Sequence, residues 1–218
     1  MEIRLEELRR VQREVSSKVV LRDGFRTPIR RISGVDLAFT DDWAIAACVA
    51  VSFPPLKIVD KVSLARRLDF PYIPGFLSFR EGPAMVEVIK NLNTESDIFI
   101  INAHGVAHPT FCGCASHVGV LANRPTIGVA ARRLCGKYEH EPMDVGEWVQ
   151  LRHGGRVVGA VLKSKERCNP IFVSPGHLIS LESSIMVVKA SIRGHKMPEP
   201  LYHAHRLANE DKRRIFSS

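Results

Sequence analysis

Two carboxylates stand out because their surroundings in the sequence are unusual for acids. Asp36 lies inside the apolar run ISGVDLAF (32–39), and Glu81 closes the run PYIPGFLSFRE (71–81). An acid within an apolar strand is costly unless it is paired or bound to a metal. Asp36 is therefore a candidate metal ligand, although a lone acid of this kind is more often a salt-bridge partner. Glu81 is a second candidate; its alternative is a plain charge favoured by the dipole at a helix N-terminus.

Acids that converge on one site can support metal-dependent hydrolysis of a phosphodiester. They hold one or two Mg²⁺ ions, which activate water and stabilise the leaving oxygen. The neighbouring PYIP segment suits a nucleic-acid substrate, because proline fixes φ and would place Tyr72 on a rigid tip. A tyrosine at such a tip can stack on a base, which is worth about 1–3 kcal/mol. A proline-stiffened turn within the core is the alternative.

The charge of the chain favours a polyanionic partner. Its 218 residues carry a formal net charge of +8, and basic residues cluster at 9–13, 22–31, 65–67, 131–133 and 211–214. Lysine and arginine neutralise phosphates and release counterions, so DNA or RNA fits this balance. A solvated basic surface is the alternative. Nothing in the composition indicates a protein partner.

Cysteine usage and the N-terminus favour a cytoplasmic protein. The five cysteines are an odd number without the spacing of a disulfide framework or a zinc pair, which indicates free thiols in a reducing compartment. The N-terminus MEIRLEELRR is charged from its second residue, unlike a signal peptide. No apolar run of 18 residues is present, so no membrane association is expected.

Hydrophobic periodicity outlines the elements that must position these residues. Helices are expected at 2–18, 82–92, 113–123 and 181–193, with a polar, basic tail after the last of them. Strands are expected at 31–39, 43–53, 57–67, 97–102, 125–130, 147–152, 156–163 and 170–174. Three antiparallel strands followed by alternating helices and strands predict an α/β fold with a mixed sheet flanked by helices. We expect one domain, residues 1–218.

Ordered motifs along nearly the whole chain resemble those of the endonuclease V family. They run from the N-terminal helix, through Gln12, to PEPL (198–201), and they include RISGVDLAF (31–39), PYIPGFLSFRE (71–81), INAHGVAHP (101–109), PTIGVA (125–130) and SPGHLISLE (174–182). The resemblance implies an RNase H-like fold, in which parallel strands follow the three antiparallel ones. It also implies a nuclease, dependent on Mg²⁺ or Mn²⁺, that nicks DNA or RNA beside deaminated adenine (hypoxanthine).

The resemblance assigns roles to individual residues. Asp36 and Glu81 would bind the metal, with His205 as an outer metal ligand. His108 would hydrogen-bond a phosphate or the nucleophilic water, and position 102 would complete the catalytic set. The nucleic acid would contact the tip, the base pocket and a neighbouring cation, which correspond to Tyr72, Pro74, Ala103 and Arg132.

Four positions depart from the family pattern. Asn102, Ala103, Thr110 and Ala131 stand where the family has Asp, Gly, Arg and Lys, although Arg132 and Arg133 follow at once. Asparagine offers a neutral carbonyl oxygen and no charge to hold a metal, and the methyl group of Ala103 would narrow a base pocket. Two hypotheses follow: a working endonuclease V-like enzyme, or a silenced or repurposed member that binds nucleic acid or acts on another modified base.

Overall fold

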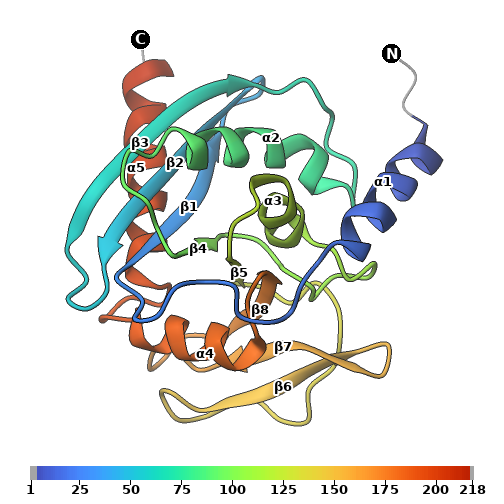
Figure 1. Ribbon diagram of the computed structural model, residues 1–218, viewed down its shortest axis with the longest axis vertical. Helices are drawn as coiled ribbons and strands as arrows, with labels where there is room; N and C mark the ends of the chain where they lie inside the picture. Colours follow the sequence, from blue (N-terminus) through green and yellow to red (C-terminus); the bar gives the residue numbers. More distant parts are fainter. Residues whose placement is uncertain (1–3, 217–218) are drawn as a thin grey trace.

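Apolar and β-branched segments of the chain pair into an eight-stranded sheet. The computed structural model, shown in Figure 1, describes residues 4–216. Its strands are β1 (Arg31–Phe39), β2 (Trp43–Ser52), β3 (Ile58–Arg67), β4 (Ile98–Ile101), β5 (Thr126–Ala130), β6 (Trp148–His153), β7 (Arg156–Leu162) and β8 (Ile171–His177). They lie in the order β3-β2-β1-β4-β5-β8-β7-β6.

The directions of the strands confirm the predicted mixed sheet. β1, β2 and β3 form an antiparallel meander. β4 is parallel to β1, and β5 is parallel to β4. β8 then pairs antiparallel with β5, and β7 and β6 continue antiparallel to the edge of the sheet. The parallel strands β1 and β4 therefore lie side by side, and the end of β4 falls next to the middle of β1.

Helices cover both faces of this sheet (Figure 1). They are α1 (Leu5–Ser17), α2 (Leu77–Lys90), α3 (Cys114–Ala122), α4 (Leu181–Ala190) and α5 (Glu199–Phe216). One core cluster joins α2 and α3 to one face through side chains such as Val35 and Leu37 of β1. A second cluster joins α4 and α5 to the other face through residues such as Ile32. Alternate residues of β1 thus face different helices, which follows from the two-residue period of a strand.

The C-terminal segment differs from the expected polar tail, because Glu199–Phe216 is an 18-residue helix. Leu201, Ala204 and Ala208 are buried in it, whereas every residue of 210–214 is charged. Charged residues are rarely buried, so this run of charges favours a solvated tail when it is taken from the sequence alone. We therefore infer that the packing of this segment on β1 and β2 stabilises its helical conformation.

Helix α2 also begins earlier than the sequence suggests, at Leu77 instead of residue 82. Proline is favoured in the first turn of a helix, yet Pro83 lies inside α2. Glu81 consequently occupies the second turn of the helix and does not start it. Of the N-terminal helix expected at 2–18, residues 2 and 3 lie outside the described residues. No helix in the described range is long and apolar enough to cross a bilayer.

Candidate active site

Asp36 is the centre of a hydrogen-bonded group that joins three parts of the chain. This β1 side chain is only 4% exposed. Its Oδ1 accepts from the Asn102 side-chain amide at 2.8 Å, and its Oδ2 accepts from Nδ1 of His205 at 2.8 Å. The backbone N–H of Leu37 also donates to Oδ1 at 2.8 Å. Three of the predicted site residues are therefore in direct contact.

Sheet register brings Asn102 to Asp36. β1 and β4 are parallel, and Val35 pairs with Ile101, the last residue of β4. The backbone N–H of Asn102 extends the ladder by donating to the carbonyl oxygen of Val35 at 3.0 Å. The residue after each of these partners is Asp36 on one strand and Asn102 on the other. Their side chains meet because the register places them next to each other at the same level of the sheet.

A close approach of α5 to β1 brings His205 to the same carboxylate. A Cβ at Gly34 would overlap the carbonyl group of Pro200 and the backbone nitrogen of Leu201, so only glycine allows the helix to sit here. Two residues along the strand advance the chain by about 6.8 Å, and four residues along the helix advance it by about 6 Å. The step from Gly34 to Asp36 thus matches the step from Leu201 to His205.

Glu81 lies close enough to Asp36 for the two acids to affect each other. Burial, and secondly the charge of Asp36, raise the pKa of Glu81 to about 7, while Arg80 opposes the shift. Burial also raises the pKa of Asp36, against the hydrogen bonds from Asn102 and His205. The charge of buried Asp36 thus disfavours the charged form of half-buried Glu81, and a cation placed near both carboxyl groups would favour their charged forms.

His108 is buried, and its neighbours fix its ring. Burial, with smaller contributions from His104 and His153, lowers the pKa of His108 to about 4, so the ring is neutral at pH 7. The backbone N–H of Thr110 donates to Nδ1 at 3.2 Å, and its hydroxyl lies 2.9 Å from the same nitrogen. Because Nδ1 accepts, the ring proton resides on Nε2, which is then a hydrogen-bond donor. In the sequence, Thr110 stands out only because it replaces the arginine of the family pattern. In the structure it orients the ring of His108.

A cavity of about 520 Å³ joins the remaining predicted residues. Its walls come from the PYIP segment, the loop after β4, the start of α3 and the segment after β5. The four residues that the sequence predicts to contact nucleic acid all line this cavity: Tyr72, Pro74, Ala103 and Arg132. Asn102 and His108 line it as well, so Asn102 connects the cavity to the Asp36 group. Tyr72 is 68% exposed, which rules out the alternative of a core turn for this side chain.

Comparison with known proteins identifies the family of this chain. The family described as Endonuclease V matches residues 13–206. The chain belongs to the endonuclease V family. It is 39% identical over 208 residues to the endonuclease V of Roseiflexus sp. (strain RS-1), covering 95% of this chain and 93% of that protein. The endonuclease V of Archaeoglobus fulgidus is 38% identical and covers 99% of this chain and 96% of its own length.

Solved endonuclease V structures share the fold. The Streptomyces avermitilis protein has a TM-score of 0.91 at 32% identity and covers 98% of this chain and 95% of its own. The human protein has a TM-score of 0.89 at 30% identity, with 97% and 99% covered. The Ciona intestinalis endonuclease V, solved with DNA containing an inosine, has a TM-score of 0.85 at 25% identity, with 97% and 98% covered. The predicted family and fold are confirmed.

The donors around Asp36 fit a metal ion that the substrate helps to hold. Within residues 4–216, no three His, Cys, Asp or Glu side chains are grouped so that they could bind a metal. Asp36 and Glu81 remain as two carboxylates, and Asn102 can add a neutral carbonyl oxygen. Mg²⁺ is often bound by one or two carboxylates together with waters and substrate phosphates. The chain therefore suits an ion shared with a phosphate better than one enclosed by protein.

Helix α1 connects two walls of the cavity, a feature that the sequence did not reveal. Gln12 is 2% exposed, and its Nε2 donates to the carbonyl oxygen of Gly75 at 2.6 Å. One turn further along, the hydroxyl of Ser16 donates to the carbonyl oxygen of Thr110 at 3.3 Å. The helix thus holds the base of the PYIP tip and the loop that carries His108 in one arrangement.

Replacing Gln12 by Ala is expected to lower the free energy of unfolding by about 0.5–1.5 kcal/mol, because the hydrogen bond from its side chain to the Gly75 carbonyl oxygen is lost. Urea denaturation followed by circular dichroism measures the change. Gln150→Ala is the matched control, since Gln150 is exposed and its loss should change stability by no more than about 0.5 kcal/mol. Equal losses in the two variants would contradict the role given to Gln12.

Proposed function

We propose that this chain is a metal-dependent endonuclease that cleaves DNA or RNA near hypoxanthine. The observation that carries the proposal is the joining of Asp36, Asn102 and His205 by hydrogen bonds beside a cavity walled by the exposed PYIP tip. The cocrystal of the Ciona intestinalis relative with inosine-containing DNA supports the choice of substrate. The net charge of +8 supports a nucleic-acid partner.

The metal-binding role falls to Asp36 and Glu81, with Asn102 and His205 assisting. A bound Mg²⁺ or Mn²⁺ ion would lower the pKa of a water molecule and stabilise the leaving oxygen. His205 and Asn102 both donate to Asp36, so they hold its carboxylate in one orientation. Glu81 would supply the second negative charge: burial, and secondly the charge of Asp36, raise its pKa to about 7, and a bound cation would lower this pKa again.

The remaining residues would bind the substrate. Neutral His108 offers its Nε2–H to a phosphate oxygen or to the attacking water. The cavity beside Ala103 would receive an extruded base, and Tyr72 and Pro74 would fill the gap that it leaves in a duplex, offsetting part of the unstacking cost of a few kcal/mol. Arg132 would neutralise a phosphate near the mouth of the cavity.

One observation favours the second hypothesis, a silenced or repurposed family member. Asn102 directs its amide nitrogen to Asp36, so the third position supplies a hydrogen-bond donor where the family pattern has a charged acceptor. Loss of one charge around a metal affects the rate of hydrolysis more than the binding of nucleic acid. This chain would then bind hypoxanthine or another modified base and cleave slowly or not at all.

Cleavage of inosine-containing DNA and RNA, single-stranded and duplex, tests the first hypothesis. With Mg²⁺ or Mn²⁺ present, we expect products from the inosine strands and none from matched adenosine strands. Asp36→Asn should lower the rate at least about a thousandfold, equivalent to about 4 kcal/mol of lost stabilisation, and EDTA should abolish cleavage. Asp41→Asn, which changes an exposed acid in a turn, is the control.

The outcomes separate the two hypotheses. Cleavage that survives both EDTA and Asp36→Asn would exclude the proposed mechanism. Specific binding of the inosine strands without cleavage would favour the silenced member.

A further inference from the structure

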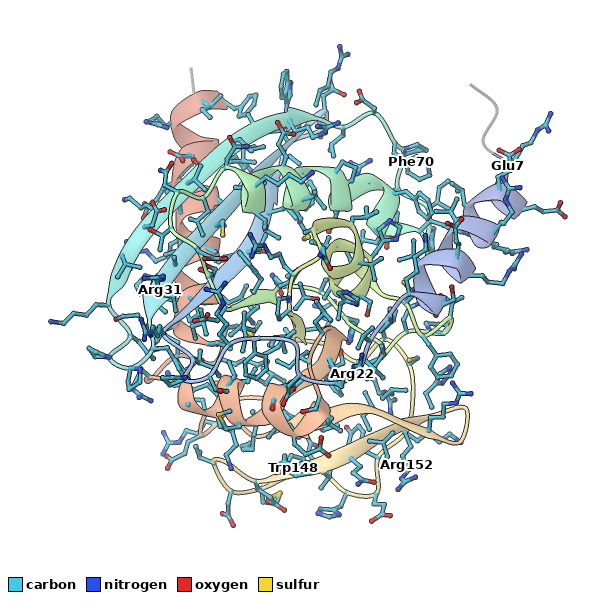
Figure 2. All side chains as sticks on the ribbon, in the orientation of Figure 1. Glu7, Arg22, Arg31, Phe70, Trp148 and Arg152 are labelled. Atoms are coloured by element: carbon cyan, nitrogen blue, oxygen red, sulfur yellow. The ribbon has the colours of Figure 1, made fainter. Side chains whose placement is uncertain are left out.

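The outer strand of the sheet carries an exposed row of side chains suited to nucleic acid. Along β6, Trp148, Gln150 and Arg152 are exposed, whereas Leu151 between them is buried. Alternate residues of a strand project from one face at intervals of about 6.8 Å. Figure 2 labels Trp148 and Arg152 at the β6 margin of the molecule. Trp148 is 39% exposed, although an aromatic ring of this size is more often largely covered.

A short segment connects this row to the candidate active site. Arg132, Arg133 and Leu134 line the active-site cavity. Lys137 then pairs with Arg152 through two backbone hydrogen bonds of 2.8 and 2.9 Å, so the chain runs directly beside β6. Three residues of extended chain span at most about 11 Å, which places Lys137 within that distance of Leu134. The two surfaces are neighbours.

A second cavity, of about 460 Å³, lies where the segment meets β6. We call its lining the β6 platform, and it consists of Lys137, Tyr138, Glu139, Trp148, Val149, Gln150 and Arg152. The platform combines two aromatic rings with two cations and one acid. The guanidinium of Arg133 lies 5.6 Å from the centre of the Tyr138 ring and adds a third cation at the side of the active-site cavity.

The charges of the platform are available to a ligand. Arg152 donates to the side-chain oxygen of Gln150 at 2.6 Å, so a neutral amide, which does not cancel the positive charge, orients the guanidinium. Glu139 is the acid of the lining, against Lys137 and Arg152. With Arg133, the local balance of charge is positive. A positively charged surface attracts a phosphate backbone and does not favour a purely apolar ligand.

We propose that the β6 platform binds a single-stranded part of the substrate after it leaves the active-site cavity. The inference rests on the proposed function, because it assigns a path to the strand whose base enters that cavity. Trp148 stacks on a base, and Lys137 and Arg152 neutralise the flanking phosphates. Exposed aromatic rings on a sheet bind unstacked bases in this way. The bases of a duplex are stacked and paired, so the platform favours single strands.

Binding of inosine-containing single strands of two lengths tests the platform. A strand of about 6 nucleotides fills only the active-site cavity, and strands of about 16 nucleotides, extended on the 5′ or the 3′ side, also reach the platform. Fluorescence anisotropy with Mg²⁺ replaced by Ca²⁺ gives the affinities. Trp148→Ala should weaken binding of one of the two long strands about 5- to 150-fold, leave the short strand unchanged, and be rescued by Trp148→Phe.

Trp43 provides the matched control. It is 37% exposed, close to the value for Trp148, and it begins β2 in the other half of the sheet. Trp43→Ala should bind every strand as the unaltered chain does. Circular dichroism of each variant confirms that it is folded, which excludes a general loss of structure as the cause.

The outcomes distinguish the platform from the proposed function. Equal binding of both long strands by Trp148→Ala and the unaltered chain would overturn the platform while leaving the cavity intact. Binding of a long strand that depends on Trp148, without binding of the short one, would support the platform and count against the cavity as a base site. An unaltered chain that binds no strand of either length would overturn both.

Discussion

Replacing Asn102 by Asp is expected to raise metal-dependent cleavage of inosine strands by about 10- to 1000-fold. The new carboxylate would lie beside Asp36, where the amide of Asn102 now donates a hydrogen bond. A further negative charge about 4 Å from a cation contributes up to about 4 kcal/mol per unit of cation charge at an effective dielectric constant of about 20. Repulsion of the new carboxylate by Asp36 and Glu81 offsets part of this stabilisation, so the expected increase in rate is given as a range. Initial rates at several Mg²⁺ concentrations measure the effect.

The same substitution should make folding stability depend on the metal. Without a cation, a third acid joins two carboxyl groups whose pKa values are already raised, and the melting temperature should fall. Mg²⁺ should restore it, and more so than in the unaltered chain, because a ligand that binds only the folded state stabilises it.

Asn91→Asp is the control for this substitution. It makes the same change of charge at the end of α2, ten residues and about 15 Å along the helix from Glu81. It should alter neither the rate nor the response to Mg²⁺. If Asn102→Asp gains neither activity nor metal-dependent stability, the site around Asp36 is not a metal site.

Strong local signals allowed most of the fold to be predicted. The expected strands at 31–39 and 125–130 correspond to β1 and β5 within one residue, because long apolar runs bounded by turn residues are distinctive. At α5 the sequence predicts a polar tail instead of a helix, because residues 210–214 are all charged. Its conformation is decided by contact with β1, which is 160 residues or more distant along the chain.

Some features of the candidate site follow from short sequence motifs, whereas others depend on contacts between residues that are far apart in the chain. The motif around Asp36 pointed to a buried acid, and the structure places that acid at 4% exposure. That His205 donates to Asp36 depends on how α5 crosses the sheet, over 169 residues of sequence. The bond from Gln12 to Gly75 spans 63 residues and left no pattern to read. Thr110, only two residues after His108, was the one partner that a local reading could have found.

The crossing of α5 over β1 leads to the second large expected effect, a loss of at least about 3 kcal/mol of unfolding free energy in Gly34→Ala. The added methyl group would overlap the backbone of Pro200 and Leu201, and backbone cannot rotate away as a side chain can. Overpacking of this kind usually costs about 1–3 kcal/mol and sometimes more. Urea denaturation measures the loss.

Gly82→Ala is the matched control, because it adds the same methyl group inside α2. The nearest atom outside that helix would be Cγ2 of Val118 at 3.9 Å, an ordinary contact. Alanine is favoured over glycine in a helix by about 0.5–1 kcal/mol, so this variant should be more stable than the unaltered chain. If the same glycine-to-alanine change destabilises the protein at Gly34 and stabilises it at Gly82, the close crossing of α5 over β1, and not the loss of glycine as such, causes the destabilisation.

The Gly34→Ala variant also tests how the fold positions the site. Because His205 lies one turn beyond Leu201, a displaced α5 should withdraw the imidazole from Asp36. The NMR signal of the His205 ring would then lose its dependence on the Asp36 side chain: Asp36→Asn should shift this signal in the unaltered chain and leave it nearly unchanged in the glycine variant. The glycine variant could instead be as stable as the unaltered chain, with a His205 signal that still depends on Asp36. That result would show that β1 and α5 can separate without disturbing the site, which would contradict the close packing of these two elements.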